Sequence, residues 1–265
     1  MTNKTVILYS GGLDSFILRE YAQRVLQLNP ISVFFDYGQP YLKKELAALP
    51  EDVIVHKIDW LKEHSVTGQI GGSEYSYYIT NRNLSLISLA ASIYTPNLIL
   101  TAFYHCTDER STDANTEFLT RANDLLKYII VPYYTSEFSV EAPFSTLGWG
   151  GKLEAIQWAL SVGIIAEQLL ATSSCFDPHV ERCGVCDACF NRWLALSANG
   201  IEETYTEHPL DSARYLPVVK RVISSDSANR DFMLPIVKRY LGLKYIEDVL
   251  AEVNNRILLL GVKNE

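Results

Sequence analysis

A short polar segment near the start of the chain carries residue types that can hold phosphate. Residues 10–15, Ser-Gly-Gly-Leu-Asp-Ser, directly follow the apolar run Val-Ile-Leu-Tyr at 6–9. This order predicts a strand, a tight turn and the start of a helix. Two adjacent glycines let backbone N–H groups converge without obstruction from Cβ atoms, and the helix start adds free N–H donors and the positive end of its dipole. We therefore expect a phosphate site; a glycine-rich turn without a ligand is the alternative.

A second group of residues has the spacing of a metal site. Four of the five cysteines follow the pattern Cys-x7-Cys-x2-Cys-x2-Cys: Cys175, Cys183, Cys186 and Cys189. The two x2 spacings let successive thiolates turn towards one centre, as in zinc sites with four thiolate ligands. Such a site leaves no position for a catalytic water, so we expect a structural Zn²⁺. An iron–sulfur cluster and redox-active or unligated cysteines are the alternatives, and Cys106, which lies apart, is expected to be an ordinary buried thiol.

Composition limits the class of protein. The chain has 265 residues, 48% of them hydrophobic, enough for one large domain or one domain with an appendage. It has no apolar run of about 18 residues, so no membrane span is expected. The first residues lead straight into a strand, which predicts no signal peptide and a cytoplasmic protein without disulfides. The net charge of −8 argues against stable binding of nucleic acid.

Apolar runs alternate with helical patterns along the first half of the chain. We expect strands at 6–9, 31–35, 53–58, 98–103 and 129–132, and helices at 14–26, 41–49, 82–94 and 115–128. The alternation predicts an α/β fold, with a parallel sheet and helices on both faces. Ligands bind at the carboxyl ends of strands in such sheets. Ser10, Asp36 and residues 103–105 (Phe-Tyr-His) follow predicted strand ends, so we expect them in one cleft.

The motifs suggest three parts of the chain. Residues 1–170 form the α/β domain, residues 171–206 a zinc-binding knuckle and helix, and residues 207–265 a helical C-terminal extension with a structural or partner-binding role.

Further motifs narrow the interpretation when they are taken together. The loop at 10–15 resembles that of the N-type ATP pyrophosphatases, or PP-loop enzymes. It is followed in order by Phe-Asp-Tyr-Gly-Gln at 35–39, Asn-Arg-Asn-Leu at 81–84, Lys-x-Glu at 152–154 and the cysteine cluster. This combination, from about Thr5 to Ala198, resembles the 7-cyano-7-deazaguanine synthase family of queuosine biosynthesis. The resemblance implies an adenine nucleotide α hydrolase-like fold, ATP and Mg²⁺ beside the structural Zn²⁺, and a homodimer.

The resemblance also implies a reaction. The carboxylate of 7-carboxy-7-deazaguanine attacks the α-phosphorus of ATP, giving an acyl-adenylate and pyrophosphate. Ammonia then displaces AMP to form an amide, and a second ATP activates the amide for dehydration to the nitrile.

The same resemblance assigns residues. Asp14 would orient the loop or bind Mg²⁺ through water, and Lys152 would lie near the reacting phosphates; a helix cap and a surface lysine are the alternative interpretations. Asp113 could equally cap a helix. The residues expected to bind ATP are Tyr9, Ser10, Gly11, Gly12, Leu13, Asp14, Ser15 and Phe16. The residues expected to line the substrate pocket are Asp36, Tyr37, Gln39, Asn81, Arg82, Asn83 and Asp113.

The sequence also departs from the family pattern. Pro40-Tyr41 stands where the family often has Arg-His, and Asn81 replaces a usual glycine, although asparagine tolerates a left-handed backbone. The run Gly-Trp-Gly-Gly at 148–151 predicts a flexible approach to Lys152.

These departures, together with the C-terminal extension, would suit a ligase of an antiviral defence system that joins the deazaguanine carboxylate to a protein amine. A tRNA-modifying PP-loop enzyme, which the acidic charge counts against, and a non-catalytic nucleotide-binding module are further alternatives.

Overall fold

The computed structural model describes residues 4–59, 65–67, 77–79, 81–105, 112–131, 137–226 and 228–262. Cys106 lies outside these ranges. The chain forms two compact units, Met1–Pro178 and His179–Glu265, and each is described by itself.

The first unit is built on a parallel sheet with the strand order β3-β2-β1-β6-β7. The central strand, β1, pairs on both sides, since Val6 lies opposite Ile31 of β2 and Ile99 of β6. Strands buried on both faces are nearly continuous apolar runs, as β1, β2 and β6 are. The bounds of the five strands are β1 (Thr5–Leu8), β2 (Ile31–Asp36), β3 (Ile54–Lys57), β6 (Leu98–Leu100) and β7 (Ser139–Glu141). A separate antiparallel pair consists of β4 (Ser65–Thr67) and β5 (Tyr77–Ile79).

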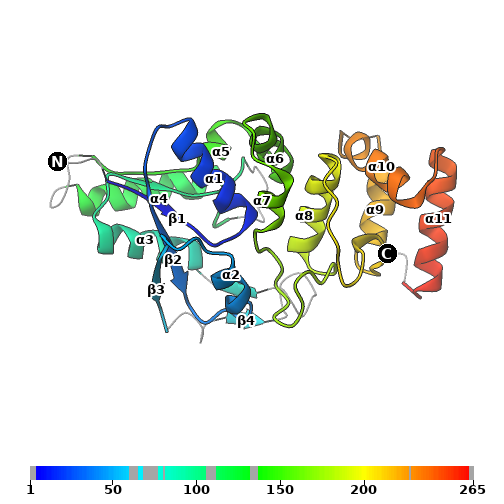
Figure 1. The fold of residues 1–265 in the computed structure, drawn as a ribbon, viewed down its shortest axis with the longest axis horizontal. Helices are drawn as coiled ribbons and strands as arrows, with labels where there is room; N and C mark the ends of the chain where they lie inside the picture. The colour runs from blue at the N-terminus through cyan, green and yellow to red at the C-terminus, as the bar shows by residue number, and fades with distance from the viewer. Residues whose placement is uncertain are drawn as a thin grey trace. The chain divides into compact units, whose positions relative to one another are not determined.

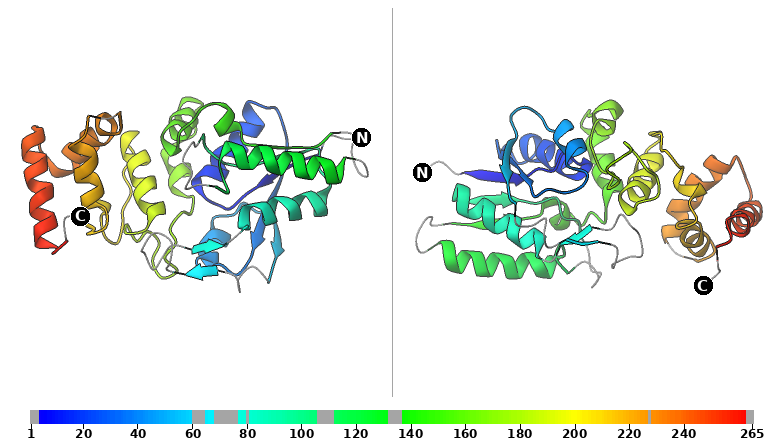
Figure 2. Two further views of the ribbon diagram at one scale, coloured as in Figure 1. Left: turned by 180° about the vertical axis from the view of Figure 1, so that it is seen from behind. Right: turned by 90° about the horizontal axis from the view of Figure 1, so that it is seen from below.

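Helices cover both faces of this sheet (Figure 1), which confirms the predicted α/β fold. On one face α3 (Arg82–Tyr94) and α4 (Thr116–Ile130) bury Ile87 and Leu126 against Val6 and Ile99. Figure 2 shows α1 (Leu13–Arg24) on the opposite face. The remaining helices of the unit are α2 (Leu42–Ala47), α5 (Pro143–Thr146), α6 (Lys152–Ser161) and α7 (Ala166–Leu170). No described helix in either unit is long and apolar enough to span a membrane.

The strand predicted at 129–132 is wrong. Ile129 and Ile130 form the last turn of α4, and Pro132 lies outside the described residues. The helix continues because Ile130 lies four residues after Leu126 and extends the buried stripe that faces the sheet. The fifth strand is β7 instead.

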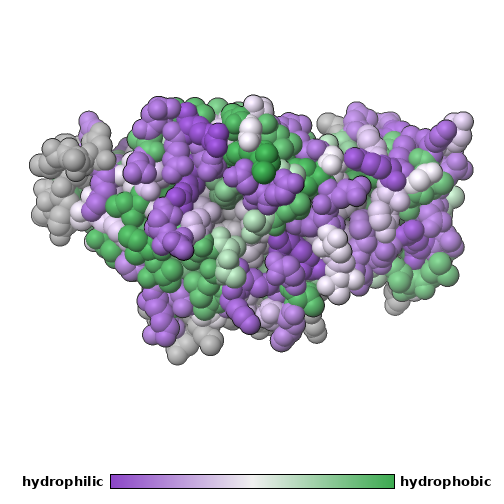
Figure 3. Space-filling view, viewed as in Figure 1, coloured by the Kyte–Doolittle hydropathy of each residue, from purple (hydrophilic) through white to green (hydrophobic). Residues whose placement is uncertain are grey.

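The surface beside β3 is partly apolar. This strand forms one edge of the sheet, and Ile54 and Val55 are exposed on it. Figure 3 shows hydrophobic surface in this region.

The second unit is helical and has a core of its own. Trp193, Leu216, Val237 and Val253 belong to one buried cluster. The elements are α8 (Asp187–Ala198), a 3-10 turn at Pro209–Asp211, α9 (Leu216–Ile223), α10 (Ala228–Leu241) and α11 (Ile246–Leu259). The predicted C-terminal helices are therefore confirmed.

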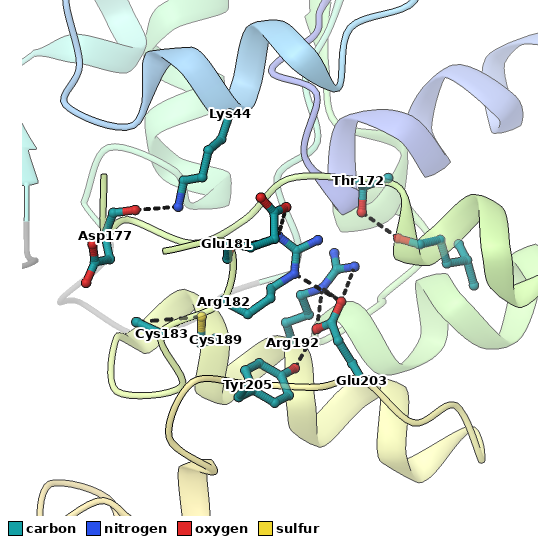
Figure 4. Close-up of polar contacts among 11 residues, drawn as sticks. Lys44, Thr172, Asp177, Glu181, Arg182, Cys183, Cys189, Arg192, Glu203 and Tyr205 are labelled. Atoms are coloured by element: carbon teal, nitrogen blue, oxygen red, sulfur yellow. Dashed lines mark hydrogen bonds and ion pairs between the residues drawn. The ribbon is translucent and has the colours of Figure 1, made fainter. Parts of the chain in front are cut away.

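A buried ion-pair network holds the start of this unit together (Figure 4). Arg192 of α8 is fully buried, and its Nε and Nη2 atoms donate to the Glu203 carboxylate at 2.9–3.0 Å. Arg182 Nε and the Tyr205 hydroxyl donate to the same carboxylate, at 3.1 and 2.6 Å. Burial alone would raise the pKa of Glu203, but the hydrogen bonds and charges of Arg192, Tyr205 and Arg182 together outweigh it, so the pKa lies below its ordinary value.

Replacing Glu203 by Gln should lower the free energy of unfolding by about 3 kcal/mol, because it leaves buried arginine charge without a counter-charge. Urea unfolding of the full chain at neutral pH, followed by circular dichroism, measures this. Glu117→Gln, which removes one partner of the exposed pair with Arg121, should change it by about 0.5 kcal/mol or less. Equal effects of the two substitutions would contradict a structural role for the network.

Candidate active site

Hydroxyl groups hold the loop between β1 and α1 in shape. The Ser15 Oγ atom accepts from the Ser10 backbone N–H at 3.1 Å and donates to the Gly12 carbonyl at 3.0 Å. Gly12, the N-cap of α1, in turn donates its N–H to Ser10 Oγ at 3.3 Å. The loop thus meets the start of α1 in a fixed conformation, where helix N–H groups and the helix dipole favour an anion.

Gly11 lets two other segments approach this loop closely. Its φ is +72°, and a Cβ atom there would lie 3.0 Å from the Glu45 carbonyl oxygen of α2. Its own carbonyl accepts from the Ser173 N–H at 2.9 Å. Both the backbone conformation and the short approach to α2 therefore require glycine.

Asp14, in the first turn of α1, joins two residues distant in sequence. Its Oδ1 atom accepts from the Tyr104 hydroxyl at 2.6 Å, and its Oδ2 atom pairs with the Lys152 ammonium. Lys152 is the first residue of α6, where the helix dipole disfavours a cation, so the Asp14 carboxylate offsets this effect. The pair in turn neutralises a carboxylate that would otherwise repel phosphate from the loop. Burial first, and then Asp14, raises the pKa of Tyr104 well above its ordinary value.

Aromatic packing fixes the segment before Lys152. Trp149 stacks on Phe144, with ring centroids 4.9 Å apart, and Phe144 stacks on Tyr104 at 5.4 Å. The Trp149 carbonyl also accepts from the His105 N–H at 2.8 Å. Trp149 thus anchors the first part of the glycine-rich run through both its ring and its backbone, and the flexibility expected of the two glycines before Lys152 stays a prediction.

A cavity of about 420 Å³ lies at the carboxyl ends of β1, β2 and β6. It brings together residues expected to bind ATP and residues expected to bind the second substrate. From the first set it is lined by Tyr9, Ser10, Asp14 and Ser15, and from the second by Tyr37, Gln39, Arg82 and Asn83.

The other predicted residues lie around the cavity without lining it. Asp36 accepts from the Gly38 N–H at 2.9 Å, and Asn81 is the left-handed N-cap of α3, with a φ of 59°. Asp113 accepts from Asn83 Nδ2 at 3.1 Å and so orients a residue that does line the cavity. The remaining residues expected to bind ATP form the loop and the start of α1; they are Gly11, Gly12, Leu13 and Phe16.

Sequence reasoning missed Glu45, which lines the same cavity. Its Oε2 atom accepts from Gln39 Nε2 at 2.6 Å, and burial raises the pKa of its carboxyl group to about 7. Glu45 follows the buried Tyr41 by four residues, the spacing that places two side chains on one helix face. That spacing was the available signal. Tyr104 was placed near the cleft, but its contact with Asp14 was not foreseen.

The four cysteines of the second predicted site converge. Their Sγ atoms all lie within 4.8 Å of one another, and all four residues are buried. The Sγ atoms of Cys183 and Cys189 are 3.9 Å apart, too far for a disulfide. A tetrahedral zinc site with bonds of about 2.3 Å separates its sulfurs by about 3.8 Å. The donor set therefore fits a single metal ion such as zinc, held by Cys175, Cys183, Cys186 and Cys189.

The backbone around these cysteines is closely packed. Gly184 has a φ of +82°, and a Cβ atom there would lie 1.6 Å from the Glu207 carbonyl oxygen. The Thr206 N–H donates to the Arg182 carbonyl and the Glu207 N–H to the Cys183 carbonyl. Residues 206–207 thus hold the turn that presents Cys183 and Cys186.

Comparison with known proteins agrees with the arrangement of the motifs. Residues 69–200 match the model of the family described as queuosine biosynthesis protein QueC. The 7-cyano-7-deazaguanine synthase of Alteromonas mediterranea is 30% identical over 226 residues, covering 76% of this chain and 96% of the relative. The enzymes of the same name from Marinobacter nauticus and Psychromonas ingrahamii are each 28% identical, covering 77% of this chain and 96% and 97% of the relatives.

Replacing Cys186 by Ser should release the metal and lower the melting temperature, because a thiolate site contributes its binding free energy to folding. Elemental analysis of the purified protein should give one zinc per chain before the change and less after it. Cys106→Ser, which leaves the cluster intact, is the matched control. A variant that keeps its metal and its melting temperature would show that the four thiolates do not bind it together.

Replacing Glu45 by Gln should stabilise the protein at alkaline pH. The pKa of this carboxyl group is about 7 in the folded chain against an ordinary 4.5, so the folded state binds the proton more tightly than the unfolded state. Wild type and variant should therefore unfold alike below pH 4.5, and the variant should gain about 1–3 kcal/mol as the pH rises from about 4.5 to about 7, with no further change above that.

Thermal unfolding of wild type and the Glu45→Gln variant across this pH range measures the difference. Glu51→Gln, at an exposed position after α2, is the control. A stability difference that does not vary with pH would contradict the raised pKa.

Proposed function

The chain belongs to the QueC family of queuosine biosynthesis proteins, and from this premise we propose that it converts 7-carboxy-7-deazaguanine to 7-cyano-7-deazaguanine with ATP and ammonia. One observation carries the proposal. The phosphate loop and the residues expected to hold the deazaguanine line the same cavity, so an ATP held by the loop would present its α-phosphorus to a carboxylate bound beside it.

In the first half-reaction the chain must stabilise negative charge where two anions meet. The loop at Ser10–Ser15 and the N-terminus of α1 would hold the β- and γ-phosphates. Lys152 does not line the cavity but pairs with Asp14, which does, and from there it would supply a cation at the reacting phosphates. Mg²⁺, when it is bound with ATP, neutralises phosphate charge, and Asp14 is the side chain that would reach it through water.

The second wall of the cavity suits a guanine-like ring. Gln39 and Asn83 line it with amide groups that are held in place by Glu45 and Asp113, and Tyr37 would offer an aromatic face to the ring. Arg82, which lines the cavity as well, would supply a cation for the substrate carboxylate.

Incubation of the purified protein with ATP, Mg²⁺ and 7-carboxy-7-deazaguanine, with and without ammonium, tests the proposal by mass spectrometry of the products. Amide and then nitrile should appear with ammonium. Adenylate or AMP without amide would contradict ammonia as the acceptor and favour the alternative ligase, which transfers the deazaguanine to a protein amine. No turnover of the deazaguanine would contradict the substrate.

Replacing Lys152 by Met should slow pyrophosphate release by about 100-fold or more, because a cation that meets developing charge contributes on that scale. Lys43→Met, at an exposed position on α2, is the matched control and should keep the wild-type rate.

Ser10→Ala and Asp14→Ala should abolish pyrophosphate release. Wild-type rates in the variants at positions 10, 14 and 152, with their fold confirmed by circular dichroism, would remove the proposed phosphate site.

A further inference from the structure

One carboxylate at the cavity has no role in the proposed reaction. Glu45 of α2 lines the cavity, and its Oε2 atom accepts a hydrogen bond from Gln39. Its Oε1 atom makes no hydrogen bond to any residue in the described part of the chain. The close approach of α2 to Gly11 fixes the distance between this carboxylate and the phosphate loop. Glu45 thus lines the cavity with one carboxylate oxygen that is not engaged by the described residues.

The surroundings of Glu45 leave its charge weakly compensated. The charged and titratable groups that face it are Arg82 from α3, Lys44 from α2, and the hydroxyl of Tyr41. None of them forms an ion pair with it among the described residues, and Lys44 donates to the Asp177 carbonyl (Figure 4). Burial dominates, so the carboxyl group exchanges its proton near neutral pH. A group of this kind is suited to general base catalysis.

We propose that Glu45 is the catalytic base that accepts a proton from the amine attacking the acyl-adenylate. This inference rests on the proposed function. The nitrogen of ammonia forms a bond to the acyl carbon, and the C–O bond to the adenylyl group breaks, with its electron pair leaving on AMP. The nitrogen is positively charged in the adduct, and one of its protons passes to the Glu45 carboxylate, which later releases it to solvent. Amide, AMP and one proton result.

Two neighbouring groups are less suited to the same task. Both carboxylate oxygens of Asp14 are engaged, by Tyr104 and Lys152. Tyr41 keeps its proton at neutral pH, because burial raises the pKa of its hydroxyl well above the ordinary value. Glu45 combines an available oxygen with a proton affinity matched to neutral pH.

The test separates the two half-reactions. ATP–pyrophosphate exchange that depends on 7-carboxy-7-deazaguanine, measured without ammonium, reports adenylation alone. Rapid mixing of the adenylate-loaded enzyme with ammonium then reports amide formation. Glu45→Gln should exchange pyrophosphate at the wild-type rate and form amide about 100-fold more slowly. Glu51→Gln should match wild type in both assays.

The pH profile and chemical rescue distinguish a base from a structural residue. The ionisation of ammonium affects both proteins equally, so the ratio of wild-type to Glu45→Gln rates isolates Glu45; it should rise through pH 7 and then level. Formate should restore part of the amide rate to Glu45→Ala. A constant ratio without rescue, or a loss of exchange together with amide formation, would overturn the assignment. Absence of exchange in the wild type would instead refute the proposed function.

Discussion

The close approach of α2 to Gly11 is the constraint on which the cavity depends. A Cβ atom at Gly11 would lie only 3.0 Å from the Glu45 carbonyl oxygen of that helix, and the carbonyl of the same glycine accepts from the Ser173 N–H. Three segments distant in sequence therefore meet at one residue without a side chain. Since α2 begins directly after the Asp36–Gln39 turn, this contact also determines where Tyr37, Gln39 and Glu45 face the phosphate loop. A wider separation would open the cavity and divide the two sets of residues.

The cavity has two chemically different sides. On one side, serine hydroxyls and loop amides create an environment for phosphate, and the charges of Asp14 and Lys152 compensate each other. On the other side, Glu45 is half-buried and has no ion-pair partner in the described chain. The first side suits a step in which negative charge accumulates, and the second suits a step in which a proton leaves a nitrogen. The two successive half-reactions of the proposed function need both.

Features that neighbouring residues determine could be predicted from the sequence, whereas features that depend on contacts between residues far apart in the chain could not. The bounds of α3 were predicted as they are observed, because Asn81 and Pro96-Asn97 mark its ends locally. β7 was missed, since it has three residues and no apolar run, and the β-branched pair in the last turn of α4 took its place in the prediction. The cysteine spacing predicted the observed convergence. The contact of Tyr104 with Asp14 spans 90 positions, so no local pattern could reveal it, and for Glu45 the spacing from Tyr41 indicated only a shared helix face, since its place at the cavity depends on the packing of α2.

Two partly buried glutamates of this chain have pKa values that are shifted in opposite directions, because their hydrogen-bond partners differ. Glu203 receives hydrogen bonds from two arginines and a tyrosine, and its pKa falls below the ordinary value although burial opposes this. Glu45 receives one hydrogen bond, from a neutral amide, and burial raises its pKa to about 7. A structural carboxylate needs charged partners, because without them its ionised form destabilises the fold. Glu45 lacks such partners and destabilises the folded chain above its pKa. An amide at position 45 would keep the hydrogen bond with Gln39 without that destabilisation, so packing alone does not account for an acid there, whereas proton transfer does.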